Sequence, residues 1–326
     1  MDPRLRGDDD RVGEGDMRRL PCSFVDTPMI DILALSPLPD TLAPSLAEHF
    51  TIHVGFDAAP LDRIRGLVGG GAMRLDADTL ARLPSLEIVA VHGVGHDGID
   101  KAALDARGVA LAITAGTLTE DVADLAIGLW LAVERRIALN DRAVRGGGWD
   151  VPLARRASGR RIGVFGLGAI GRAIAARAAP FASELLYTAR SAKDVPWRFL
   201  PDLRALAAES DVLFLAAAAG AETDGAVDAD VLAALGPQGV LVNVARGSLV
   251  DQAALIAALD AGGIAGAGLD VFADEPAVPA PMHRETVVLS PHQGSATVEA
   301  RAAMAAMVVA NLQAHFAGDV PPGLVR

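Results

Sequence analysis

Short apolar runs alternate with amphipathic segments over the first third of the chain. The apolar runs predict β-strands at Ile30–Leu35, Thr51–Val54, Gly66–Val68, Leu86–Val91 and Val109–Ile113. The segments between them predict helices at Pro44–His49, Asp76–Leu83 and Lys101–Asp105. Strands that alternate with helices are typical of βαβ units, so we expect a parallel sheet in this region.

A second βαβ region follows a long helical segment. We predict one helix that starts at Thr119 as N-cap, has acidic residues in its first turn, and ends at about Arg145 before the run Gly146–Gly148. Further strands are predicted at Arg161–Phe165, Glu184–Thr188, Val212–Ala216, Val240–Val244, Gly266–Leu269 and Thr286–Leu289. The amphipathic segment Val298–Phe316 predicts a closing helix.

Residues 1–28 are rich in charges and lack an apolar period, so we interpret them as a disordered extension or an upstream mis-start. Translation then begins at Met1, Met17 or Met29. A targeting peptide is the weaker alternative, because transit peptides are poor in acidic residues.

Composition fits an α/β protein with extensive cores and narrows its partners. Hydrophobic residues make up 51% and aromatic residues 4%, as expected for buried parallel strands under alanine-rich helices. The net charge of −12, without a basic block, disfavours a nucleic-acid partner. No apolar run reaches the roughly 18 residues of a membrane span. A single cysteine, Cys22, excludes a disulfide framework and a cysteine-based zinc site, and we expect no metal. The N-terminus shows no secretion signal, so we expect a cytoplasmic protein.

A glycine-rich loop opens the second βαβ region. Gly166, Gly168 and Gly171 follow a predicted strand and precede a predicted helix at Arg172–Ala179, with another strand beyond it. In this context the three glycines permit a tight turn, close approach of a pyrophosphate and close packing of helix on strand. The pattern therefore predicts a dinucleotide site, whereas a tight turn without a ligand is the alternative.

The next strand ends in Arg190 and Ser191, with Lys193 nearby. NAD enzymes commonly carry an acidic residue at this place, where it accepts hydrogen bonds from the adenosine ribose. An arginine instead pairs with a 2′-phosphate. We therefore predict that NADP(H) is preferred over NAD(H); the alternative is that Arg190 only solvates the strand end.

Three polar motifs lie just after predicted strands of this region. They contain Arg246, then Asp270 with Asp274 and Glu275, then His292. Because ligands bind at the carboxyl ends of parallel strands, we expect these residues to converge. An arginine that holds a carboxylate, a histidine that moves a proton and an acid that orients the histidine form a plausible hydride-transfer site.

With these motifs the chain resembles the D-isomer-specific 2-hydroxyacid dehydrogenases from about residue 30 to 320. The order and spacing of Arg246, Glu275 and His292, and the segment Asn243–Asp251, carry the resemblance. It implies that Arg246 holds the carboxylate of a 2-oxo acid, that His292 protonates the carbonyl oxygen, and that Glu275 hydrogen-bonds His292. On chemistry alone Asp274 is an alternative partner; the family pattern, an acid directly before Pro276, favours Glu275.

The resemblance also implies binding residues. Backbone N–H groups of Val94 and Gly95 would grip the substrate carboxylate, together with Arg246 and His292, and Asp270 would orient the nicotinamide carboxamide. The implied cofactor contacts are Gly166, Leu167, Gly168, Ala169, Ile170, Arg190, Ser191, Val244, Ala245, Arg246, Asp270, His292 and Gly294. We expect His96 in the substrate loop to have a surface or loop role rather than to transfer protons.

The implied fold has two Rossmann-like domains: a flavodoxin-like substrate domain (29–117 plus 298–326) and a doubly wound NAD(P)-binding domain (118–297). Arg190 and the loop Gly69–Ala72 look most like NADPH-linked glyoxylate/hydroxypyruvate reductases or hydroxyphenylpyruvate reductases. Relatives are homodimers, and Trp149 either reaches the partner's substrate or packs in the interface. The same fold also serves corepressors that act as NAD-sensing interaction proteins, so a non-enzymatic role is the alternative.

Overall fold

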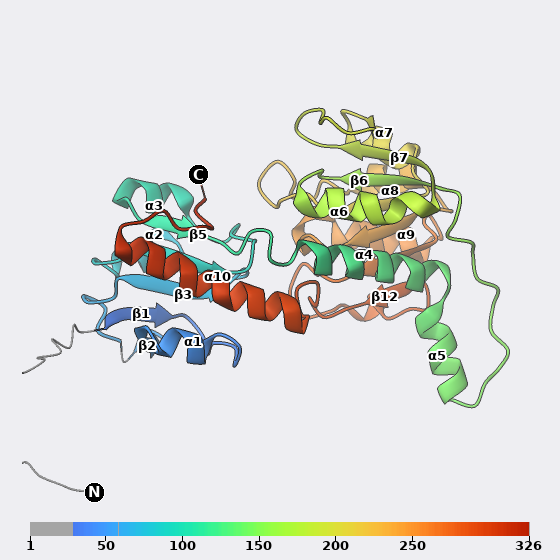
Figure 1. Cartoon of the computed structure of the whole chain (residues 1–326). Helices are drawn as coiled ribbons and strands as arrows, with labels where there is room; N and C mark the ends of the chain where they lie inside the picture. Colours follow the sequence, from blue (N-terminus) through green and yellow to red (C-terminus); the bar gives the residue numbers. More distant parts are fainter. Residues whose placement is uncertain (1–28, 58, 326) are drawn as a thin grey trace, which may run out of the picture.

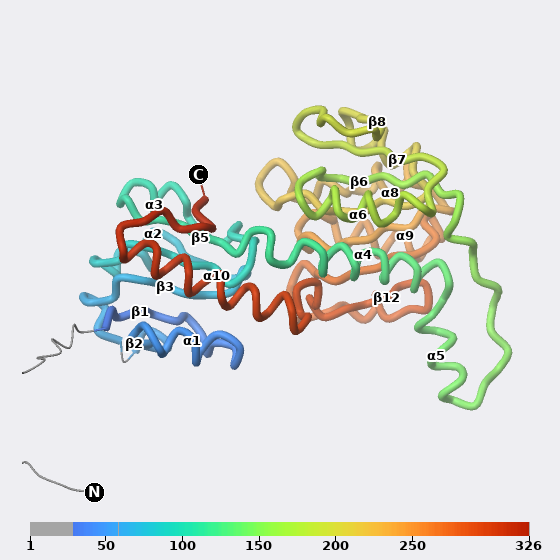
Figure 2. The backbone as a smooth tube through the Cα atoms, in the orientation of Figure 1, coloured from blue at the N-terminus to red at the C-terminus, as the bar shows by residue number. Residues whose placement is uncertain are grey.

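The computed structural model describes residues 29–57 and 59–325. The predicted N-terminal extension at 1–28 therefore lies outside the described residues. Two sheets lie side by side, and the chain passes between them before helix α4 and again at helix α10 (Figures 1 and 2).

The first sheet has five parallel strands in the order β2-β1-β3-β4-β5, which is the flavodoxin-like doubly wound order. The strands are β1 (Ile30–Ala34), β2 (Phe50–Val54), β3 (Gly66–Gly70), β4 (Ile88–His92) and β5 (Ala110–Ala112). The helices between them are α1 (Ala43–Ala47), α2 (Ala77–Ala81) and α3 (Lys101–Arg107). All five predicted strands and all three predicted helices are confirmed, with shifted ends.

The second sheet has seven parallel strands in the order β12-β11-β10-β9-β6-β7-β8. The strands are β6 (Arg160–Phe165), β7 (Ala182–Thr188), β8 (Arg198–Phe199), β9 (Val212–Leu215), β10 (Val240–Asn243), β11 (Gly266–Leu269) and β12 (Val287–Leu289). The order reverses direction at β6, as in a dinucleotide-binding sheet. Six strands were predicted; β8 has two residues, too few for an apolar run.

Helices cover both faces of the second sheet. One face packs under α4 (Thr119–Glu134) and α6 (Ala169–Ala178), and the other under α7 (Leu203–Ala208), α8 (Ala229–Leu235) and α9 (Gln252–Asp260). Short 3₁₀ helices occur at Ala179–Phe181, Gly247–Leu249 and Ala280–Met282. Trp130 of α4 is fully buried and makes edge contacts with Phe181 and Phe214. These three rings form an aromatic cluster in the core between α4 and the sheet.

The prediction of one helix from Thr119 to Arg145 is wrong. Helix α4 ends at Glu134 and α5 (Ile137–Arg145) begins after Arg136, whose φ of 52° is left-handed. Neither glycine nor proline marks this break. The last residue of α4 makes tertiary contacts: buried Glu134 pairs with Arg155 at 3.2 Å and with Arg160 at 3.5 Å, and burial raises the pKa of Glu134.

The predicted N-cap of this helix is also wrong. Leu118 occupies the N-cap position, and its hydrocarbon side chain makes no cap; Thr119 is already inside the first turn. The acidic first turn is present in Glu120 and Asp121. Glu120 pairs with Arg177 of α6, so the charge of this turn links two helices.

Helix α10 (Val298–Ala317) confirms the predicted closing helix and connects the two cores. Its first turns place Ala300 and Met304 in the core of the seven-stranded sheet, and its later turns place Val308 and Leu312 against the five-stranded sheet. The helix thus runs across the join between the sheets, as Figure 1 shows.

The three glycines between β6 and α6 have separate structural roles. Gly166 has a φ of 94°, and a Cβ there would lie 2.5 Å from the backbone of Ala217. A Cβ on Gly171 would lie 1.9 Å from the Gly166 carbonyl oxygen, so only glycine lets α6 pack this closely on the loop. Gly168 is the N-cap of α6, and a Cβ there would meet nothing within 4 Å.

We predict that Gly171→Ala lowers stability, whereas Gly168→Ala weakens dinucleotide binding. The first should lower the free energy of unfolding by about 1–3 kcal/mol, because the clash is with backbone and forces repacking. The second should leave the thermal unfolding midpoint nearly unchanged but weaken dinucleotide binding, since the added methyl points into the open space at the helix N-terminus. Thermal unfolding and fluorescence titration with NADPH measure both effects. Equal thermal stability of the two variants would contradict this account of the loop.

Candidate active site

The end of β7 borders the glycine loop, because Phe165 of β6 pairs with Thr188 of β7. Arg190 and Ser191 follow that strand and are exposed. The backbone N–H of Lys193 donates to the Tyr187 hydroxyl at 2.7 Å, and the Lys193 ammonium donates to the Ser191 hydroxyl at 3.2 Å. This exposed, positively charged turn therefore stands beside the open N-terminus of α6, where an anion is stabilised. The other implied cofactor contacts of this loop are Leu167, which is buried, and Ala169 and Ile170, which begin α6.

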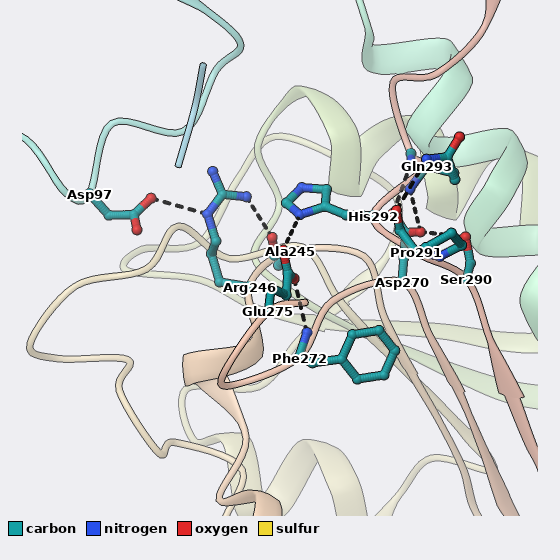
Figure 3. A network of polar contacts seen from close by, with 11 residues as sticks. Asp97, Ala245, Arg246, Asp270, Phe272, Glu275, Ser290, Pro291, His292 and Gln293 are labelled. Carbon is teal, nitrogen blue, oxygen red and sulfur yellow. Dashed lines mark hydrogen bonds and ion pairs between the residues drawn. The ribbon is translucent and has the colours of Figure 1, made fainter. Parts of the chain in front are cut away.

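His292 and Glu275 form a hydrogen-bonded pair. The Nδ1 atom of His292 lies 2.7 Å from Oε2 of Glu275 (Figure 3). The other carboxylate oxygen accepts the backbone N–H of Phe272 at 3.0 Å, which fixes the carboxylate. Because a carboxylate accepts, Nδ1 carries the proton and Nε2 is the atom left for a substrate. The structure thus brings Glu275, not Asp274, to the histidine.

A buried carboxylate shapes the loop that carries His292. Asp270 is 1% exposed and accepts the Ser290 hydroxyl and the Gln293 N–H on one oxygen and the Gly294 N–H on the other, at 2.6–2.8 Å. Its carbonyl accepts the N–H of His292 at 2.8 Å. His292 is held at a φ of 55°, which few non-glycine residues adopt. Sequence reasoning missed this loop-shaping role of Asp270; its implied contact with the nicotinamide carboxamide stays a prediction.

Arg246 faces the first sheet from the second. Its Nε lies 3.1 Å from Oδ1 of Asp97, in the loop after β4, and its Nη1 donates to the Ala245 carbonyl at 2.7 Å (Figure 3). The buried side chain of Asn243 fixes the turn, since it donates to the Arg246 carbonyl and accepts from the N–H of Ala245. Val244 and Ala245 thus come directly after β10, where cofactor contacts are implied.

The loop after β4 lies against Arg246. A Cβ on Gly95 would come within 1.3 Å of Nη2 of Arg246, so the guanidinium occupies the space beside the Gly95 backbone. Val94 packs against the core of the seven-stranded sheet. The two residues implied to grip a carboxylate are therefore next to the arginine implied to hold it.

The other histidines of this region do not join the site. His92, the last residue of β4, is 6% exposed; burial, reinforced by the charge of Arg301, lowers its pKa to about 4, so it is neutral at pH 7. The Nδ1 atom of His96 lies 3.1 Å from the Val94 carbonyl oxygen, a contact within the loop. Both observations agree with structural roles for these rings.

A cavity of about 210 Å³ lies beside His292 and Glu275. Its other lining residues are mostly apolar: Phe272, Pro276, Val278, Leu289, Ser290 and Pro291. Trp149 lies outside this cavity, and its side chain is 86% exposed.

Within residues 29–57 and 59–325, no group of three or more His, Cys, Asp or Glu side chains is arranged to hold a metal ion. None of the helices in this described part has the length and hydropathy needed to cross a membrane.

Comparison with known proteins extends these observations. Residues 127–294 match the family model of the D-isomer specific 2-hydroxyacid dehydrogenase, NAD binding domain. The chain is 43% identical over 295 residues to 2-ketogluconate reductase of Gluconobacter oxydans, covering 88% of this chain and 95% of that protein. It is 43% identical over 303 residues to glyoxylate/hydroxypyruvate reductase A HPR2 of Arabidopsis thaliana, covering 89% and 96%.

A solved structure is similar over most of the chain. The NADPH-dependent glyoxylate/hydroxypyruvate reductase of Sinorhizobium meliloti, in complex with NADP and malonate, has a TM-score of 0.87 and 40% identity. The match covers 90% of this chain and 96% of that one. The fold is therefore the Rossmann-like two-domain dehydrogenase fold, and the chain belongs to the D-isomer-specific 2-hydroxyacid dehydrogenase family, as an NAD(P)-dependent oxidoreductase that acts on 2-oxo and 2-hydroxy acids.

Proposed function

We propose that this enzyme reduces a small 2-oxo acid, glyoxylate or hydroxypyruvate, to the 2-hydroxy acid, which for hydroxypyruvate is the D isomer, with NADPH as the hydride donor and His292 as the general acid. The observation that carries the proposal is the arrangement of Arg246 and the Glu275–His292 pair at the carboxyl edge of one parallel sheet, with the loop after β4 opposite. The names of two similar reductases, in Arabidopsis thaliana and Sinorhizobium meliloti, support the substrate class.

The dinucleotide fits the residues present. Open space in front of Gly168, at the N-terminus of the ten-residue helix α6, suits a pyrophosphate, and Arg190 with Lys193 suits a 2′-phosphate. When bound, the nicotinamide supplies the hydride. The remaining chemistry is a proton transfer and charge stabilisation by side chains of this chain.

Arg246 and the backbone N–H groups of Val94 and Gly95 hold the substrate carboxylate and so orient the 2-oxo group. His292 donates the proton on Nε2 to the carbonyl oxygen as negative charge develops there, and Glu275 stabilises the imidazolium through Nδ1. In the oxidative direction the same Nε2 accepts the proton of the hydroxy acid.

We further propose that the two domains, 29–117 plus 298–326 and 118–297, close on the substrate and exclude water. We also propose a homodimer. Helix α5 and the chain after it stand away from the body of the subunit (Figure 1), and they expose Val144, Trp149 and Leu153, the last two at 86% and 94%. Apolar side chains this exposed on a projecting segment suit an interface.

The substrate class is tested by initial rates of NADPH and NADH oxidation with hydroxypyruvate, glyoxylate, phenylpyruvate and 2-ketogluconate. We expect the highest kcat/KM with NADPH and hydroxypyruvate or glyoxylate. Faster turnover of 2-ketogluconate or phenylpyruvate would keep the reaction class and replace the substrate. No turnover with any of the four acids would overturn the proposal and favour a dinucleotide-sensing interaction protein.

The cofactor preference is tested at Arg190. Arg190→Asp should lower the ratio of kcat/KM with NADPH to kcat/KM with NADH by about 100-fold, because a carboxylate repels the 2′-phosphate that the arginine pairs with. Arg190→Lys is the matched control; it keeps the positive charge but loses the bidentate fork, so it should retain part of the preference. An unchanged ratio in Arg190→Asp would mean that Arg190 only solvates the strand end.

A further inference from the structure

We propose that Asp97 is a positioning residue for the reaction: its carboxylate holds the guanidinium of Arg246 across the join between the two sheets, so that the remaining N–H donors meet the substrate carboxylate. The inference rests on the proposed function, since it takes Arg246 as the residue that holds the substrate. Asp97 itself does not touch the substrate; it acts through Arg246.

The contact joins parts of the chain that lie 149 residues apart. Asp97 belongs to the loop after β4 in the first sheet, and Arg246 follows β10 in the second. The Nε–Oδ1 distance is 3.1 Å, and the two side chains are 25% and 38% exposed, Arg246 being the more buried. A partly exposed pair of this kind adds little to folding stability, so its effect is chiefly on the direction of the guanidinium.

The geometry leaves the arginine able to bind an anion. The guanidinium has five N–H donors. Asp97 accepts from Nε and the Ala245 carbonyl accepts from Nη1, so about three donors remain, and Nη2 has no hydrogen-bond partner among the described residues. The side chain is therefore fixed at two points while its far end stays available.

The far end of the guanidinium lies beside the loop that supplies backbone donors. Nη2 is the atom that a Cβ on Gly95 would strike, and it would lie 3.8 Å from a Cβ on Gly71. A carboxylate bound there would meet Arg246 and the N–H groups of the loop together. Because Asp97 lies two residues after Gly95 in the same loop, its pair with Nε sets the distance between the Arg246 guanidinium and the backbone N–H groups of the loop.

The test compares steady-state kinetics of Asp97→Ala and Asp97→Asn with hydroxypyruvate. We expect Asp97→Ala to raise KM for the 2-oxo acid by about 10- to 100-fold, because a misdirected guanidinium loses one charge-assisted hydrogen bond to the substrate carboxylate. KM for NADPH should stay within about twofold of the wild type. Asp97→Asn keeps an acceptor oxygen and should fall between Asp97→Ala and the wild type. Asp100→Ala is the matched control: this carboxylate of the same loop only caps α3, so its loss should lower the unfolding midpoint without raising KM.

A double-mutant cycle separates positioning from general damage. Asp97→Ala added to Arg246→Gln should raise KM by less than about twofold further, since its effect passes through the missing guanidinium. The inference would be overturned if Asp97→Ala raised KM in the Arg246→Gln background as much as it does in the wild type. An unchanged KM in Asp97→Ala would also overturn it. So would a lower KM, which would mean that Asp97 competes with the substrate for Arg246. If Arg246→Gln itself left KM unchanged, the proposed function of Arg246 would fail instead.

Discussion

Parallel pairing throughout both sheets is the constraint on which the site depends. Because every strand pair runs in the same direction, the carboxyl ends of β10, β11 and β12 meet at one edge of the second sheet. Arg246 follows β10, Asp270 and Glu275 follow β11, and His292 follows β12. Residues far apart in the sequence thus converge with no long-range signal other than strand order.

Convergence alone would not orient the side chains; hydrogen bonds from neighbouring polar residues do so. Asp270 hydrogen-bonds to the His292 loop, where the histidine has a left-handed backbone. Asn243 hydrogen-bonds within the extended turn that carries Arg246. Glu275 is fixed by the Phe272 N–H and in turn fixes the imidazole. The loop of His292, its imidazole and the turn of Arg246 are therefore each held by a neighbouring polar residue. Groups held in this way need little reorganisation when charge develops in the transition state.

The sequence predicts most of the fold and the approximate location of the site, because both follow from local patterns. Apolar runs, the glycine loop and the residues after strands are local features. What sequence reasoning missed arises from tertiary contacts. The break at Arg136 has no glycine or proline and lies two residues after Glu134, which pairs with Arg155 and Arg160. The pair of Asp97 with Arg246 joins two sheets. The choice between Asp274 and Glu275 needed the family pattern, and the structure brings Glu275 to His292.

The most direct test of the account is single-turnover reduction of hydroxypyruvate by His292→Asn. Asparagine tolerates the left-handed backbone at this position, so the loop should keep its shape. We expect an affinity for NADPH within a few fold of the wild type, because only one of the implied cofactor contacts changes. The unfolding midpoint should be close to that of the wild type, with hydride transfer slower by about 10²- to 10⁴-fold. Hydride transfer at close to the wild-type rate would contradict the assignment of His292 as the general acid.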